Sequence, residues 1–245
     1  MPPNSIVSLV PSLTELLFDL GIGEQVSGRT RFCIHPKDQV AEVPVVGGTK
    51  NPRLDKIREI EPDLIIANKE ENRREDIEEL KRDFDVYVSE VSNINEALFT
   101  IHDIGWKCGV EEKSKKLIHT IQERMEGVPD EKPMTAAYMI WRDPWMSVGG
   151  DTYIHSVMDH WNLRNVYADK TRYPNISLEE ISYKKPDVIL LSSEPYPFKE
   201  KHIKEVSDVC KGTSIILVNG EWFSWYGSGM VKAFEQLNVL RRAIA

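Results

Sequence analysis

The chain has 245 residues, of which 41% are hydrophobic and 29% charged, and its formal net charge is −8. This length suits one large domain or two of ordinary size, and the composition is typical of a globular protein. The acidic balance argues against a nucleic-acid-binding surface, which requires clustered Lys and Arg. No stretch approaches the roughly 18 apolar residues that cross a bilayer, so we expect no membrane insertion.

The first residues and the cysteines bear on the compartment. "MPPNSIVSLVPS" (1–12) has neither the basic region nor the long apolar region of a secretory signal. We therefore expect a periplasmic or cell-surface protein if a leader has been removed, and a cytoplasmic one if Met1 is the native start. Cys33, Cys108 and Cys210 are widely spaced and odd in number, which predicts reduced, mostly buried thiols.

Short apolar runs alternate with amphipathic helical patterns along the chain. The predicted strands cover 6–10, 44–48, 63–67, 85–89, 135–140, 187–192 and 214–218. The predicted helices cover 12–20, 53–60, 72–82, 94–107, 111–126, 151–161, 177–184, 199–209 and 229–243. This alternation predicts an α/β fold of Rossmann-like lobes, in which helices cover both faces of parallel sheets. In the first helix we expect Ser12 as the N-cap, a capping box completed by Glu15, and an end at Gly21.

One helical segment differs from the others. "GVEEKSKKLIHTIQERMEGVPDEKP" (109–133) is long and highly charged, and its apolar stripe is narrow. A mostly solvated helix in mid-chain suits a connector between two lobes. We therefore predict an N-terminal lobe at 1–108, a connecting helix at 109–130 and a C-terminal lobe at 131–245, with an ordinary surface helix of one domain as the alternative.

An internal repeat supports two similar lobes. "RLDKIREIEPDLIIANKE" (53–70) aligns without gaps to "SLEEISYKKPDVILLSSE" (177–194), at an offset of 124 residues. The matching positions are Leu54 with Leu178, Asp55 with Glu179, Ile57 with Ile181, Pro62-Asp63 with Pro186-Asp187, and Glu70 with Glu194. Each copy is predicted to be a helix, a Pro-Asp turn and a buried strand. A shared Pro-Asp turn alone could be convergent, but the acidic matches at both ends favour a true repeat.

The sequence contains none of the common catalytic motifs. We find no phosphate-binding loop, no nucleophile elbow and no HExxH zinc motif. His155 and His160 are five residues apart, which directs them to different sides of a helix and makes a poor metal pair. We therefore expect no enzyme, no catalytic residues and no metal site.

Aromatic and arginine residues recur just after the predicted strands. The candidate ligand-binding residues of this kind are Arg31, Phe32, Trp141, Arg142, Trp145, Tyr173, Trp222 and Trp225. Ligands of open α/β sheets bind outside the carboxyl ends of the strands. Flat aromatic faces and guanidinium groups there would suit a large planar or anionic ligand. For the run "GEWFSWYGSG" (220–229), which we place on a loop after a strand, a satellite core cluster is the competing interpretation.

The chain resembles the solute-binding proteins of ABC importers, specifically the branch that binds cobalamin and ferric siderophores. The resemblance covers nearly the whole chain and is carried by "IVSLVPSLTELLFDLGIGEQVSG", "VPVVGGTKNPRLDKIREIEPDLIIA", "YPNISLEEISYKKPDVILL" and "EWFSWYGSGMVKAFEQL". It implies two lobes joined by a single long helix, with a ligand cleft between the lobes. It also implies that Phe32 or Arg31, Trp145, Tyr173, Glu221 and Trp222 contact the ligand. Asp55 and Glu179 correspond to the carboxylates with which the family docks to its permease.

Together these observations predict a monomeric substrate-binding protein of a metal-chelate importer. The expected ligand is cobalamin, a ferric siderophore or a haem-like molecule, without any resident cofactor. The expected partner is an ABC permease, and no nucleic acid is involved. The alternative is a cytoplasmic enzyme or carrier of corrinoid or metal-chelate metabolism on the same scaffold.

Overall fold

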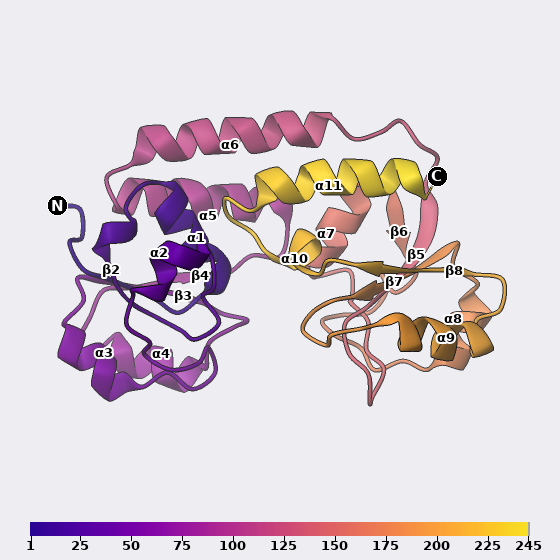
Figure 1. Cartoon of the computed structure of the whole chain (residues 1–245), viewed down its shortest axis with the longest axis horizontal. Coiled ribbons are helices and arrows are strands. Elements are labelled where there is room, and N and C mark those ends of the chain that lie inside the picture. Colours follow the sequence, from indigo (N-terminus) through magenta and orange to yellow (C-terminus); the bar gives the residue numbers. More distant parts are fainter. Residues whose placement is uncertain (245) are drawn as a thin grey trace. The chain divides into compact units, whose positions relative to one another are not determined.

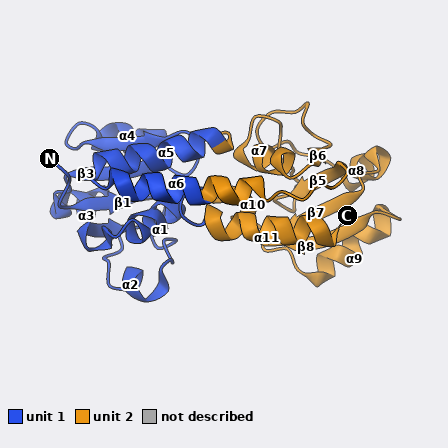
Figure 2. Ribbon diagram, turned by 90° about the horizontal axis from the view of Figure 1, so that it is seen from above, with its two compact units in different colours: residues 1–91, 95–120, 226–229 blue, residues 92–94, 121–225, 230–245 orange. Residues whose placement is uncertain are grey.

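A computed structural model describes residues 1–244, which form two compact units (Figure 2). Unit 1 contains residues 1–91, 95–120 and 226–229. Unit 2 contains residues 92–94, 121–225 and those from 230 onward. The division between residues 120 and 121 falls inside α6 (Glu111–Glu126), the helix that we predicted as the connector.

Unit 1 is built on a four-stranded parallel sheet (Figure 1). The strand order is β2 (Val26–Arg29), β1 (Ile6–Ser8), β3 (Leu64–Asn68) and β4 (Val86–Ser89). On one face α3 (Leu54–Ile60) and α4 (Arg74–Leu80) cover a core that includes Val7, Leu9, Ile65 and Ala67. The other face carries α1 (Pro11–Asp19) and α5 (Ile94–Lys107). Because both faces are covered, β1 and β3 are buried along their whole length.

Unit 2 repeats this plan. Its parallel strands are β6 (Leu163–Asn165), β5 (Met134–Met139), β7 (Val188–Ser192) and β8 (Ser214–Val218), in that order. Helices α8 (Leu178–Lys184) and α9 (Glu200–Val209) pack against Ala137, Met139, Ile189 and Leu191. On the opposite face lie α7 (Tyr153–His160), the one-turn α10 (Glu221–Ser224) and α11 (Met230–Ala243) (Figure 1). The predicted α/β fold with two parallel sheets is confirmed.

Most predicted elements are present, but one predicted strand is absent and two strands were missed. The segment 44–48 is not a strand: Val45 makes one bridge, to Arg29, and Gly47 turns the chain with a φ of 119°. A Cβ at Gly47 would lie 2.7–3.0 Å from the backbone of residues 51–53, so only glycine allows this turn. The edge strands β2 and β6 were missed, because they are short and lack a continuous apolar run.

Other local predictions have mixed outcomes. Ser12 is not the N-cap of α1, because Pro11 is already the first helical residue and the extended Val10 precedes it. Gly21 does end that helix, with a φ of 71°. Two short α-helices, α10 and α2 (Lys37–Ala41), and the 3₁₀ helix Gly23–Gln25 were not predicted. Cys33, Cys108 and Cys210 are free and buried, as expected.

The internal repeat has a common geometry. Helices α3 and α8 both end in a residue with left-handed backbone, Glu61 (φ 50°) and Lys185 (φ 48°). The aspartate two residues later then fastens the start of the first strand of its own unit. Asp63 Oδ2 accepts from the N–H of Asn4 at 2.7 Å, and Asp187 Oδ2 accepts from the N–H of Thr135 at 2.7 Å. The repeated Pro-Asp therefore performs the same structural task in both units.

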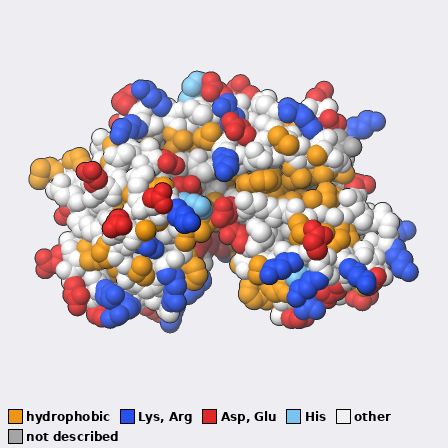
Figure 3. Space-filling view, in the orientation of Figure 1, with side chains coloured by type: hydrophobic (Ala, Val, Ile, Leu, Met, Phe, Trp, Pro, Cys, Tyr) orange, Lys and Arg blue, Asp and Glu red, His pale blue; other side chains and the backbone are white. Residues whose placement is uncertain are grey.

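None of the helices within residues 1–244 has the length and apolar character required to cross a membrane. On the face shown in Figure 3, Lys and Arg side chains are interspersed with Asp and Glu over both units.

Candidate functional site

The loop after β5 presents aromatic and arginine side chains at the carboxyl end of the unit 2 sheet. The chain turns back on itself here, because the Met146 N–H donates to the Trp141 carbonyl at 3.2 Å and the Ile140 N–H donates to the Met146 carbonyl at 3.0 Å. Trp141 remains 39% exposed and meets Tyr196 edge-on, with ring centroids 5.7 Å apart. Trp145 is half-buried and stacks on Phe198 at 5.8 Å and an angle of 12°.

Arg142 in this loop is committed to ion pairs within unit 2. Its guanidinium donates to both carboxylate oxygens of Glu205 on α9, at 2.8–3.1 Å, and to Asp143 at 2.6 Å. Arg142 lowers the pKa of the Glu205 carboxyl through this pair. The guanidinium also lies 5.9 Å from the ring of Trp145. Arg142 is thus placed to hold Trp145, and most of its donors are already used.

Tyr173 lies in the loop between β6 and α8. This loop is held by backbone contacts, since the Gly149 N–H donates to the Arg172 carbonyl at 2.7 Å and the Arg172 N–H donates to Asp151 at 2.5 Å. The Tyr173 ring is 37% exposed, and the Arg172 guanidinium lies 5.6 Å from its centroid.

The run 221–226 divides among three environments, which corrects our interpretation of it as a single loop. Glu221, Trp222 and Phe223 form most of α10, where Phe223 is fully buried against Tyr138 at 4.9 Å. Glu221, Trp222 and Trp225 are half-buried. Tyr226 belongs to unit 1, although the C-terminal lobe that we predicted at 131–245 included it.

In unit 1, Tyr226 closes a buried polar network at the carboxyl ends of β3 and β4. Its hydroxyl lies 2.5 Å from the Asn68 amide nitrogen and 2.9 Å from the Ser89 hydroxyl. Burial raises the pKa of Tyr226, so its hydroxyl keeps its proton. The core interpretation is therefore correct for Tyr226 and Phe223.

Arg31 and Phe32 lie in the loop after β2, at the carboxyl end of the unit 1 sheet. Arg29, the last residue of β2, stabilises this loop by donating to the carbonyls of Val40 and Cys33 at 2.7 and 3.2 Å. Phe32 is 52% exposed, and the Arg31 guanidinium lies 5.6 Å from its ring. Among residues 1–244, no carboxylate lies within ion-pair distance of Arg31, so its donors are available.

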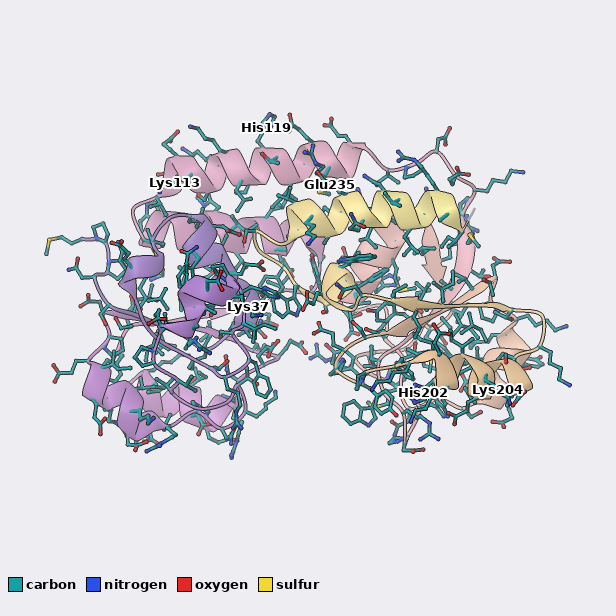
Figure 4. All side chains as sticks on the ribbon, viewed as in Figure 1. Lys37, Lys113, His119, His202, Lys204 and Glu235 are labelled. Carbon is teal, nitrogen blue, oxygen red and sulfur yellow. The ribbon has the colours of Figure 1, made fainter. Side chains whose placement is uncertain are left out.

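Sequence reasoning missed the loop after β7, "SEPYPF" (193–198). Tyr196 and Phe198 support Trp141 and Trp145, and they pack on the buried His202 of α9, which Figure 4 labels. Glu194 is half-buried beneath α10, and burial raises the pKa of its carboxyl. The signal was present, because an acidic residue and two aromatics directly follow a predicted strand.

Asp55 and Glu179 occupy equivalent exposed positions in the two units. Each is the second residue of its helix, Asp55 in α3 and Glu179 in α8. They differ in their neighbours: Arg53 Nη2 lies 3.0 Å from Asp55 Oδ2, whereas no ion pair of Glu179 occurs in the described chain. The Arg53 hydrogen bond lowers the pKa of Asp55.

These features match a known family of proteins. Residues 6–212 correspond to the family of periplasmic binding proteins. The chain belongs to this family. Its members are substrate-binding proteins and not enzymes, which confirms that prediction.

Individual relatives share less than 30% of their residues with this chain over the aligned regions. The ABC transporter substrate-binding lipoprotein YvrC of Bacillus subtilis, itself uncharacterized, is 28% identical over 201 residues, which are 77% of this chain and 63% of that protein. The chain thus spans less than two thirds of that relative. The vitamin B12-binding protein of Vibrio cholerae is 24% identical over 197 residues, which are 78% of this chain and 71% of that protein.

Solved structures share the fold. The periplasmic vitamin B12 binding protein BtuF of Vibrio cholerae superimposes with a TM-score of 0.84 at 21% identity, covering 99% of this chain and 98% of that one. The periplasmic heme-binding protein RhuT from Roseiflexus sp. RS-1 gives 0.84 at 19% identity, covering 98% of both chains.

Proposed function

We propose that this chain is the substrate-binding component of an ABC importer and that its ligand is a planar metal chelate of the corrin or porphyrin kind. It works outside the cytoplasmic membrane, as the names of its relatives suggest. The alternative, a cytoplasmic enzyme or carrier, is not favoured by these relatives.

One observation carries the proposal: three arginine–aromatic pairs follow the carboxyl ends of parallel strands. They are Arg31 with Phe32, Arg142 with Trp145, and Arg172 with Tyr173, each with the guanidinium 5.6–5.9 Å from the ring. Flat aromatic faces of this kind bind large planar ligands by stacking, and the adjacent guanidinium orients the ring and adds positive charge. The position agrees with the general location of ligands in open α/β sheets.

The three arginines are not equivalent, and the difference bears on the ligand. Arg142 is engaged by Glu205, whereas Arg31 retains free donors on an exposed loop. A free guanidinium recognises carboxylate or phosphate groups through paired hydrogen bonds. Arg31 is therefore the side chain that we propose for contacting an acidic substituent at the rim of the ligand.

The partner that we propose is an ABC permease. Asp55 and Glu179 support this, because the repeat places both carboxylates at the exposed start of equivalent helices. Basic residues of a permease would complement them, which is the charge pairing expected at a protein interface.

Absorption titrations with hemin, cyanocobalamin and ferrichrome test the ligand class. We expect saturable 1:1 binding of at least one macrocycle, with no chemical change in the recovered ligand. Arg31→Ala should lower the affinity for a carboxylate-bearing macrocycle about 10-fold or more, the range for a lost charged hydrogen bond. Arg31→Lys should recover part of this affinity. A porphyrin with esterified carboxylates should bind wild type and Arg31→Ala equally.

Two results would reject the proposal. If the protein binds ferrichrome and neither macrocycle, its ligand is a siderophore and not a planar chelate. Product formation from any of the probes would favour the enzyme.

A further inference from the structure

Glu194 joins the end of β7 to α10. The Ser224 hydroxyl donates to Glu194 Oε1 at 2.7 Å, and the Trp225 indole N–H donates a second hydrogen bond to the same carboxylate. Both donors lie on or directly after α10, a helix of only four residues. Such a short helix has little stability of its own, so its position depends on contacts of this kind.

The backbone around Glu194 is shaped to bring its side chain under α10. The Ser192 hydroxyl donates to the Glu194 carbonyl at 2.6 Å, and it accepts from the buried Tyr138 hydroxyl at 3.0 Å. Gly220, which precedes α10, leaves the space: a Cβ there would lie 2.5 Å from Glu194 Cγ and 2.4 Å from Ser192 Oγ. A polar chain therefore runs from Tyr138 through Ser192 and Glu194 to α10.

We propose that Glu194 is a positioning residue that holds α10, and with it Trp222 and Trp225, in the orientation that receives the ligand. This inference rests on the proposed function, because it assigns α10 to the ligand-binding face. Glu194 acts through the helix, and no contact of its own with the ligand is required.

A carboxylate suits this task better than an amide. A carboxylate offers two acceptor oxygens, and both Ser224 and Trp225 are donors here. A glutamine has the same size but no charge: its oxygen can accept from the Trp225 N–H, while its NH₂ group can only donate to the Ser224 hydroxyl. Glu194→Gln thus removes the charge-assisted hydrogen bond from Ser224 without changing the size of the side chain.

The charged state of Glu194 is sensitive to its surroundings. Burial raises the pKa of its carboxyl, the nearby carboxylate of Glu221 raises it further, and the hydrogen bonds from Ser224 and Trp225 lower it. On β5, Tyr138 also faces this group, and burial keeps its hydroxyl protonated. As the pH falls, Glu194 should therefore become protonated at a higher pH than an ordinary glutamate. We expect this protonation to weaken the hydrogen bonds that hold α10.

Two measurements test the proposal, with Glu194→Gln, Glu194→Asp and Ser224→Ala as variants and the exposed Glu200→Gln as the matched control. The first is ligand-free: near-ultraviolet circular dichroism and tryptophan fluorescence as a function of pH. We expect a transition above the usual pH range of a glutamate in wild type and Glu200→Gln that is absent in Glu194→Gln. The second is affinity for hemin and cyanocobalamin, which should fall about 10-fold in Glu194→Gln and less in Ser224→Ala, as expected for one lost hydrogen bond to a charged group.

The outcomes separate this proposal from the proposed function. If wild type binds neither macrocycle, the proposed function fails, and the ligand-free titration still decides whether Glu194 holds α10. If wild type binds but Glu194→Gln binds equally well and keeps the pH transition, the positioning role is rejected. If Glu194→Gln does not fold, the same two measurements are made on Glu194→Asp and Ser224→Ala, because each of these variants weakens one contact to α10.

Discussion

The guanidinium of Arg142 and the carboxylate of Glu205 form a paired contact, with N–O distances of 2.8–3.1 Å, that ties the loop after β5 to α9. Arg142 lowers the pKa of the Glu205 carboxyl. The pair therefore contributes its full stabilisation to the fold at pH values above the usual pKa of a glutamate. This stabilisation is lost as the pH falls through the lowered pKa of Glu205.

We predict that Arg142→Lys lowers the melting temperature slightly and weakens ligand binding, because lysine cannot form the forked contact that steadies Trp145. Thermal melts at neutral and acidic pH measure this, and the difference from wild type should shrink at acidic pH. An undiminished difference at acidic pH would contradict the assigned role of Glu205.

Trp141→Ala should weaken binding of the macrocycle by about 1–3 kcal/mol, the range for a truncated aromatic anchor. The loss of stability should be small, because the Trp141 side chain is already 39% exposed. Trp106→Ala is the control, since Trp106 is 65% exposed on α5, outside the loops that follow the strand ends. Equal affinities of the two variants, measured by absorption titration, would exclude Trp141 from the site.

Trp222→Ala should behave like Trp141→Ala, with a loss of affinity of about 1–3 kcal/mol. Trp145→Ala is a less specific probe, because Trp145 is half-buried on Phe198 and its removal should also destabilise unit 2. Denaturant unfolding of both variants distinguishes these effects. If Trp222→Ala unfolds and hemin does not protect it, Trp222 is a core residue.

Asp187→Ala should destabilise unit 2, because Asp187 accepts two hydrogen bonds from Thr135 at 2.7 Å where β5 begins. The aspartate is exposed, so the expected loss is no more than about 1 kcal/mol. These bonds lower the pKa of Asp187, and their contribution is present above the usual aspartate range and lost as pH falls through the lowered pKa. Urea unfolding should show the loss at neutral pH, while the exposed Asp208→Ala should show none.

Reversal of both docking carboxylates, Asp55→Lys with Glu179→Lys, should abolish docking to the permease and leave ligand affinity unchanged. The two single variants should differ, because Arg53 already pairs with Asp55 whereas Glu179 has no such partner in the described chain. We expect the Glu179→Lys variant to lose more uptake. If the double variant transports the ligand at the wild-type rate, Asp55 and Glu179 have no docking role and contribute only to helices α3 and α8.

The sequence by itself determined the fold class and the two similar units. Continuous apolar strands such as "DVILLS" (187–192) can be buried only in a sheet covered on both faces, and this pattern is local. The repeat was equally readable, because the Pro-Asp turn is a short-range feature of the chain.

Only the tertiary structure decided which aromatic and charged side chains are free. Trp222 and Phe223 are neighbours in sequence, yet the fold buries Phe223 on Tyr138 and leaves Trp222 half-exposed. Arg31 and Arg142 both follow strands, but only Arg142 meets a carboxylate, 63 residues later in the chain. Such contacts depend on how distant segments pack, so no local pattern predicts them.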